Sequence, residues 1–210
     1  MLRLLIAVAV AGLISVPVAA AGTPTPDAHD RALAHRLAAK VVELQKVTSA
    51  SKGSDDKITN SLKGCKGLAK TPGESFAVVF AMLPVLLIEA VNELRPLLLD
   101  VRATVANMHP HADVFRRWLA GERADIDQIL AFDNHGKKID DCAAAKVMLA
   151  KKPTDAQVRE ALGVPLSRIK ALFSATSSSG SATVTKLNPQ MRKFLIAAGV
   201  RRSVAVELTK

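Results

Sequence analysis

The sequence predicts an all-α protein, a disulfide-linked helical bundle with a bent central hydrophobic helix and a flexible basic C-terminal tail. Hydrophobic residues make up 49% of the 210 residues and aromatic residues only 3%, so the core must consist largely of Ala, Leu, Val and Ile. These side chains suit closely packed helices, and they recur at helical spacing along most of the chain. The two cysteines, Cys65 and Cys142, provide one pair for a disulfide.

The N-terminus has the three parts of a signal peptide. Arg3 supplies a basic start, an uncharged apolar run covers residues 4–16, and residues 19–21 fit an A-x-A cleavage site. We therefore expect a mature chain that begins at Ala21 or Gly22 and that is secreted or otherwise extracytoplasmic. An uncleaved membrane anchor is the alternative.

Composition divides the chain into four segments. We expect a signal peptide over residues 1–21, a helical bundle domain over 22–175, a Ser/Gly-rich linker over 176–187, and a basic C-terminal helix and tail over 188–210. The linker boundary rests on the run SATSSSGSAT, which is too polar to bury.

An exported protein with an isolated cysteine pair is expected to oxidise it. We predict a Cys65–Cys142 disulfide, worth about 4–5 kcal/mol on the chain-entropy model because it closes a long loop. Zinc ligation is the weaker alternative, since neither cysteine has a second Cys or a His close by in the sequence.

The most hydrophobic stretch, SFAVVFAMLPVLLIEAV, belongs to the central helical segment over residues 72–107. Between Glu74 and Glu89 it has 14 uncharged residues, or about 21 Å of helix, whereas a bilayer core needs about 30 Å. The sequence therefore predicts a core helix and no transmembrane span in the mature chain. Pro84 and Pro96 each remove a backbone donor, so we expect bends or breaks at both.

Helix start and stop signals place the other elements. We expect helices over residues 25–50, 110–132, 142–150, 154–163, 166–173 and 188–199. Thr154 and Gln157 form a capping box, and Gly136 and Gly163 are suited to the positive φ of a helix end. The run SVAVELT (203–209) alternates like a strand and could pair with residues 182–187, which makes a small β-α-β appendage an alternative for the C-terminus.

Positive charge is concentrated near the C-terminus. The chain has a net charge of +10, and residues 151–210, with eleven basic and three acidic side chains, carry +8 of it. Such an excess favours an anionic partner, such as membrane headgroups, a wall polymer or an acidic protein. The candidate patch comprises Lys151, Lys152, Arg192, Lys193, Arg201 and Arg202. A solvated face that only keeps the protein soluble is the alternative.

The central segment is also a candidate ligand site. If the bend at Pro84 leaves its apolar side chains without neighbours, a gap would form that could admit an apolar, lipid-like molecule. The candidate lining comprises Phe76, Phe80, Met82, Leu83 and Leu87. Plain core packing explains the same residues, and we favour it.

Residues 154–173, TDAQVREALGVPLSRIKALF, resemble a bacterial helix-turn-helix, with ALGV at the turn. The resemblance implies a recognition helix over residues 166–173 that would present Ser167, Arg168 and Lys170 to the major groove. Arg159 departs from the pattern, because a small residue is usual four positions before the turn glycine. Together with export, this departure favours an ordinary helical corner, and we do not expect a nucleic-acid partner.

Catalytic motifs do not occur: the sequence has no H-E-x-x-H, no G-x-S-x-G and no phosphate-binding glycine loop. His109 and His111 flank a proline and are more typical of an exposed helix start than of a metal site, and Glu89 with Glu93 forms an ordinary polar stripe. We therefore predict no catalytic, cofactor or metal residues.

Taken together, these features favour an exported, non-catalytic binding protein at or outside the cell envelope. Its expected target is an anionic surface or a protein partner. A carrier of an apolar ligand, held beside the 72–107 segment, is the second hypothesis, and an enzyme or a DNA-binding protein are weaker alternatives.

Overall fold

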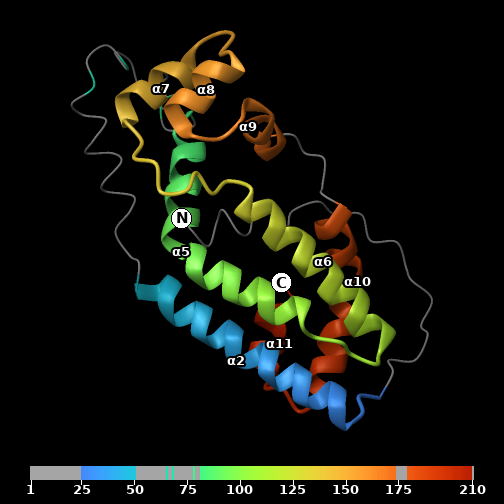
Figure 1. The fold of residues 1–210 in the computed structure, drawn as a ribbon. Helices are drawn as coiled ribbons and strands as arrows, with labels where there is room; N and C mark the ends of the chain where they lie inside the picture. The colour runs from blue at the N-terminus through green and yellow to red at the C-terminus, as the bar shows by residue number, and fades with distance from the viewer. Residues whose placement is uncertain are drawn as a thin grey trace. The chain divides into compact units, whose positions relative to one another are not determined.

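The computed structural model describes residues 25–50, 81–173 and 179–209, together with residues 65, 68 and 78. These residues form eight α-helices and no strand (Figure 1). Cys65 and Cys142 form a disulfide, with their Cα atoms 5.4 Å apart. The predicted all-α class and the predicted disulfide are both confirmed.

The chain divides into two compact units that alternate along the sequence. The first contains residues 51–96 and 129–176, and the second contains residues 2–50, 97–128 and 177–210. Helix α5 (Leu83–Ala106) contributes to both units, and the boundary within it follows Pro96.

The first unit contains three short helices, α7 (Asp141–Leu149), α8 (Asp155–Leu162) and α9 (Leu166–Phe173). Capping residues set their ends: Asp140 accepts two backbone N–H groups at the start of α7, and Thr154 and Gln157 form the predicted capping box of α8. Their buried side chains are Ala144, Ala145, Val158, Leu162 and Ile169.

Asn134, in the turn that follows α6, ties this unit together. Its Nδ2 donates to the carbonyl oxygens of Lys137 (2.9 Å) and Leu162 (3.1 Å), and its Oδ1 accepts from Asn92 Nδ2 on α5 (2.7 Å). Gly136 and Gly163 both have the positive φ expected of them, +74° and +78°. One buried amide therefore connects α5, the turn and the end of α8.

The second unit contains α2 (Ala28–Ala50), the C-terminal part of α5, most of α6 (Asp113–Leu130), α10 (Ser179–Ala197) and α11 (Arg202–Leu208). In its core Phe115 lies against Phe194, with ring centroids 5.5 Å apart. Trp118 is buried, and its indole N–H donates to Asn188 Oδ1 at 2.9 Å. The apolar side chains that predicted a helix over residues 110–132 therefore lie on the face of α6 that packs into the core.

The alternative of a small β-α-β appendage is wrong, because both of its candidate strands are helical. Residues 182–187 lie in α10, and residues 203–208 lie in α11, which contacts α2 and α10. Residues 179–187, which fall within the Ser/Gly-rich linker segment, belong to the first part of α10. An apolar stripe explains the difference, because burial outweighs the low helix propensity of Ser, Gly and Thr. The buried members of the stripe are Val184, Leu187, Met191, Phe194 and Leu195.

The two prolines of the central segment have different environments. Pro84 lies in the first turn of α5, where a missing N–H costs little, and a turn at Met82 precedes it. Pro96 lies inside the helix, which continues through it to Ala106. No helix among the described residues is long and apolar enough to cross a membrane.

Candidate functional site

An open pocket of about 310 Å³ lies in the second unit, where the end of α5, the following loop and α6 meet. It is lined by Val105, Ala106, Met108, His109, Pro110, Arg116, Leu119, Ala120 and Arg123. Val105, Met108 and Leu119 are buried and form an apolar floor. The polar side chains of the lining, from His109, Arg116 and Arg123, are exposed and form the rim.

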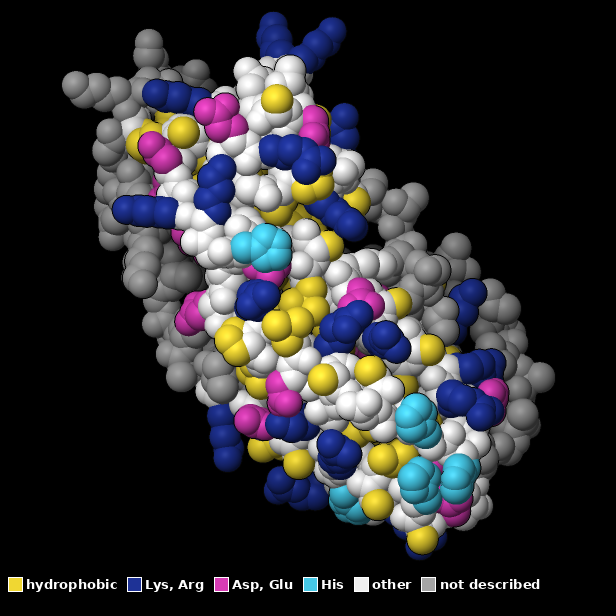
Figure 2. Space-filling view, in the orientation of Figure 1, with side chains coloured by type: hydrophobic (Ala, Val, Ile, Leu, Met, Phe, Trp, Pro, Cys, Tyr) yellow, Lys and Arg dark blue, Asp and Glu magenta, His cyan; other side chains and the backbone are white. Residues whose placement is uncertain are grey.

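Helical spacing explains why two arginines reach the same pocket. Arg116, Ala120 and Arg123 are four and three residues apart, so they lie along one face of α6. Ala120 contributes only a methyl group, which leaves room between the two guanidinium groups. In Figure 2 histidine side chains gather at the end of this unit, next to Lys and Arg side chains.

The pocket rim carries excess positive charge. Asp113 in the first turn of α6 accepts from Arg116 Nη2 at 3.2 Å and from Arg117 Nε at 2.7 Å, so one carboxylate serves two guanidinium groups. Arg123 has no ion-pair partner in the described part of the chain. An anion at the rim would therefore meet Arg123, which makes no ion pair with a described residue. It would also meet Arg116, whose carboxylate partner, Asp113, binds Arg117 as well.

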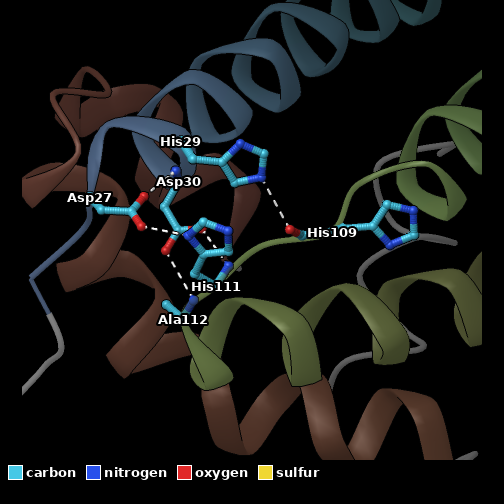
Figure 3. Close-up of polar contacts among 6 residues, drawn as sticks. All are labelled: Asp27, His29, Asp30, His109, His111 and Ala112. Atoms are coloured by element: carbon cyan, nitrogen blue, oxygen red, sulfur yellow. Dashed lines mark hydrogen bonds and ion pairs between the residues drawn. The ribbon is translucent and has the colours of Figure 1, made fainter.

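The N-terminus of α2 holds the loop that forms one wall of the pocket. Asp30, only 2% exposed, accepts from the backbone N–H groups of His111 (2.8 Å) and Ala112 (3.0 Å). His29 Nε2 donates to the carbonyl oxygen of His109 at 3.1 Å (Figure 3). Because these contacts come from α2, the loop between α5 and α6 is held in place by a helix that is far from it in the sequence.

An ion pair reinforces the same junction. His111 Nδ1 donates to Asp27 Oδ2 at 2.6 Å, and the His111 ring stacks on His29 with centroids 4.6 Å apart. The hydrogen bond that His111 donates to the Asp27 carboxylate, and then the charge of Asp27, raise the pKa of His111 above its usual 6.5. The backbone N–H of Asp30 and then the His111 ring lower the pKa of Asp27 below 3.8. Asp27 also caps α2, because Asp27 Oδ1 accepts from the backbone N–H of Asp30 at 2.7 Å.

His109 and His111 do not converge on a common point. Figure 3 shows the His109 ring directed away from His29 and His111, on the side opposite to Asp27. Among the residues described by the structure, no three His, Cys, Asp or Glu side chains are arranged to hold a metal ion.

The candidate cationic patch is divided between the two units. Lys151 and Lys152 follow α7 in the first unit and are exposed, whereas the other four residues belong to the second unit. Lys193, Arg201 and Arg202 are exposed there. Arg192 is half-buried and donates to Thr209 Oγ1 (2.9 Å) and to the Thr209 carbonyl oxygen (2.7 Å), so it holds the C-terminal helix.

The candidate apolar lining is only partly described. Phe76 and Phe80 lie outside the described residues; Met82 is buried, and Leu83 and Leu87 are half-buried. The pocket that the structure shows lies further along the same 72–107 segment, at its C-terminal end. Sequence reasoning missed this lining, although the Arg-x3-Ala-x2-Arg spacing on α6 was a usable signal.

The segment that resembles a helix-turn-helix does form two helices, α8 and α9, joined at a corner. Asp155 Oδ1 accepts from the backbone N–H of Leu166 across this corner at 2.8 Å. Ser167, Arg168 and Lys170 are exposed on α9. A helical corner explains these contacts without DNA.

No protein-family model matches the sequence, and no curated protein or solved structure is significantly similar to it.

Proposed function

We propose that the protein is an exported, non-catalytic binding protein that acts at or outside the cell envelope through the cationic surface of its second unit. The partner is an anionic surface or an anionic molecule. The observation that supports this most directly is that the acidic side chains of this unit are largely used in internal pairs, while many of its basic side chains are not.

The pairing of the acidic groups can be followed residue by residue. Asp100 pairs with Lys40 at 2.6 Å, Asp127 pairs with Arg102, and Asp113 is shared by two arginines. Burial, and then the nearby charge of Asp125, raise the pKa of Glu122 to about 8, so this carboxyl carries little negative charge at neutral pH.

The basic groups that remain are exposed and make no ion pair with a described residue. They are Arg31, Arg36, Lys46, Arg123, Lys186, Lys193, Arg201 and Arg202. An exposed, unpaired cation loses little by exchanging water for an anionic partner, whereas a paired one must first leave its carboxylate. Attraction to anionic surfaces is therefore a property of this unit, and it should weaken with salt.

Vesicle binding tests the proposal. The mature protein should bind vesicles of phosphatidylglycerol and phosphatidylcholine at low salt, ignore pure phosphatidylcholine, and dissociate as salt rises. Arg201→Glu with Arg202→Glu should reduce this binding strongly, and the fold should survive because a carboxylate at the start of α11 is favourable.

Lys151→Glu with Lys152→Glu is the matched control, since it makes the same change in net charge with an adjacent exposed pair in the first unit. An equal loss in both variants would mean that net charge alone drives binding. No binding to anionic vesicles, even at low salt, would mean that the surface charge only solvates the protein.

A further inference from the structure

We propose that the pocket between the end of α5 and α6 binds an amphiphilic anion, a carboxylate or phosphate group attached to an apolar chain. This inference rests on the proposed function and assigns its anionic ligand a specific site. Arg116 and Arg123 would take the anionic group, and the floor formed by Val105, Met108 and Leu119 would take the chain.

The rim selects for an anion with more than one oxygen. A guanidinium group presents paired N–H donors that match the oxygens of a carboxylate or a phosphate. Arg116 and Arg123 are seven residues apart, which is about 10 Å along the helix axis, and their long side chains can bend toward Ala120 between them. His109, in the loop that follows α5, offers a third polar group in the lining.

The floor selects for an apolar body next to that anion. Val105, Met108 and Leu119 are already buried in the core, so neighbouring core side chains hold them in place. An apolar ligand chain that contacts them would pack against a rigid apolar surface. A volume of about 310 Å³ is at the lower end of the range typical of small-molecule sites, which favours a single short chain over a two-chain lipid held entirely inside.

The pocket is also preorganised. Its loop wall is held by Asp30 and by His29 from α2, as described above, so ordering this wall adds little to the cost of binding. The free rim arginine, Arg123, is the side chain with the most to gain, because it has no carboxylate among the described residues.

Calorimetric titration of the mature protein with monomeric decanoate, decanol and acetate tests the assignment. Decanoate should bind saturably, while decanol lacks the anion and acetate lacks the chain, so both should bind much more weakly. Arg123→Gln should weaken decanoate binding about tenfold, the loss expected for one charge-assisted hydrogen bond. Decyl phosphate should follow the same pattern.

Arg117→Gln is the matched control. Arg117 is the next residue after Arg116, pairs with the same Asp113 and carries the same charge, but it does not line the pocket. Ala120→Leu provides an independent variant, since it keeps every charge, places a good helix former in α6 and fills the space between the two arginines. It should abolish decanoate binding while circular dichroism shows an unchanged fold.

The outcomes separate this inference from the proposed function. Absence of saturable decanoate binding, or equal effects of Arg123→Gln and Arg117→Gln, overturns the pocket even if anionic vesicles still bind. Decanoate binding without vesicle binding supports the pocket and overturns the surface function. If Ala120→Leu weakens vesicle binding as well as decanoate binding, the anion that the pocket takes is a membrane lipid headgroup. If Ala120→Leu weakens decanoate binding alone, the ligand is a free amphiphile. Both results support the pocket.

Discussion

Glu122, among the titratable groups that the structure describes, has a carboxyl whose pKa is well above its usual range. It is half-buried on α6, and burial is the main reason why the pKa of its carboxyl rises from 4.5 to about 8, with Asp125 adding to the effect. The folded state therefore binds a proton that the unfolded chain releases between these pH values. Stability must fall as the pH rises through this window.

We expect Glu122→Gln to stabilise the protein at pH 7–8 by about 1–2 kcal/mol, which is less than the full pKa difference implies because the group is partly solvated. Urea unfolding at pH 5, 6, 7 and 8 should show the gap between variant and wild type widening with pH. Glu160→Gln, an exposed glutamate on α8, is the control. A gap that does not change with pH would contradict the shifted pKa.

At the scale of elements, the junction between α2 and α6 depends on groups that titrate. His111 has a raised pKa, so its ion pair with Asp27 contributes stability in full below about pH 6.5 and loses it as the pH rises through the folded-state pKa. Asp27 has a lowered pKa, so its contribution is present above about pH 3.8 and is lost as the pH falls through the lowered value. The pair therefore stabilises the junction between these two limits.

His111→Gln should accordingly lower the melting temperature at pH 6 by more than at pH 9, because the positive charge of the wild-type ring is lost as the pH rises. Melting followed by circular dichroism across this range provides the measurement. His35→Gln is a suitable comparison, because His35 is exposed on α2 and makes no ion pair with a described residue. If His111→Gln had the same effect at both pH values, the ion pair would have no role at the junction.

Helices whose ends are set by local chemistry could be predicted from the sequence, and α8 shows why. Its capping box and its terminal Gly163 act within a few residues of the helix, so a linear pattern contains them. Helix α10 shows the opposite. Its first nine residues are rich in Ser, Thr and Gly, and only burial of Val184 and Leu187 in the folded unit explains their helicity.

The candidate pocket could be predicted only in part. The spacing of Arg116 and Arg123 places both on one face of α6, but no local pattern predicts that this face meets the end of α5 and the loop after it. Asp30 is a further example, because it caps the backbone of residues 111 and 112 from a helix far away in the sequence. Composition predicted an anionic partner, but only the ion pairs show which of the described basic side chains have no carboxylate partner among the described residues.

At the scale of the whole molecule, the disulfide is the feature with the largest expected effect on stability. The disulfide joins Cys142, at the start of α7, to Cys65, which lies 77 residues earlier in the sequence and in the same unit. Replacing both with serine should cost about 4–5 kcal/mol of unfolding free energy on the chain-entropy model.

Denaturant unfolding of the double serine variant, compared with the oxidised wild type, checks this value. Reduced wild type should behave like the variant, because both lack the same link. If the variant were as stable as the oxidised protein, the unfolded chain would already hold these two segments together, and the entropic explanation would fail.

The buried Trp118 gives the protein an optical property that is useful in all of these measurements. It is the sole tryptophan, and the sequence has no tyrosine, so the fluorescence of the intact chain comes essentially from one indole ring in the second unit. Because Trp118 is buried, we expect an emission maximum at shorter wavelength than that of an exposed indole, and a shift to longer wavelength when unfolding exposes the ring to water. The disulfide, in contrast, can be reduced in the first unit without touching the fluorophore. A melt recorded by fluorescence before and after reduction therefore reports how far a loss of order in one unit is transmitted to the other.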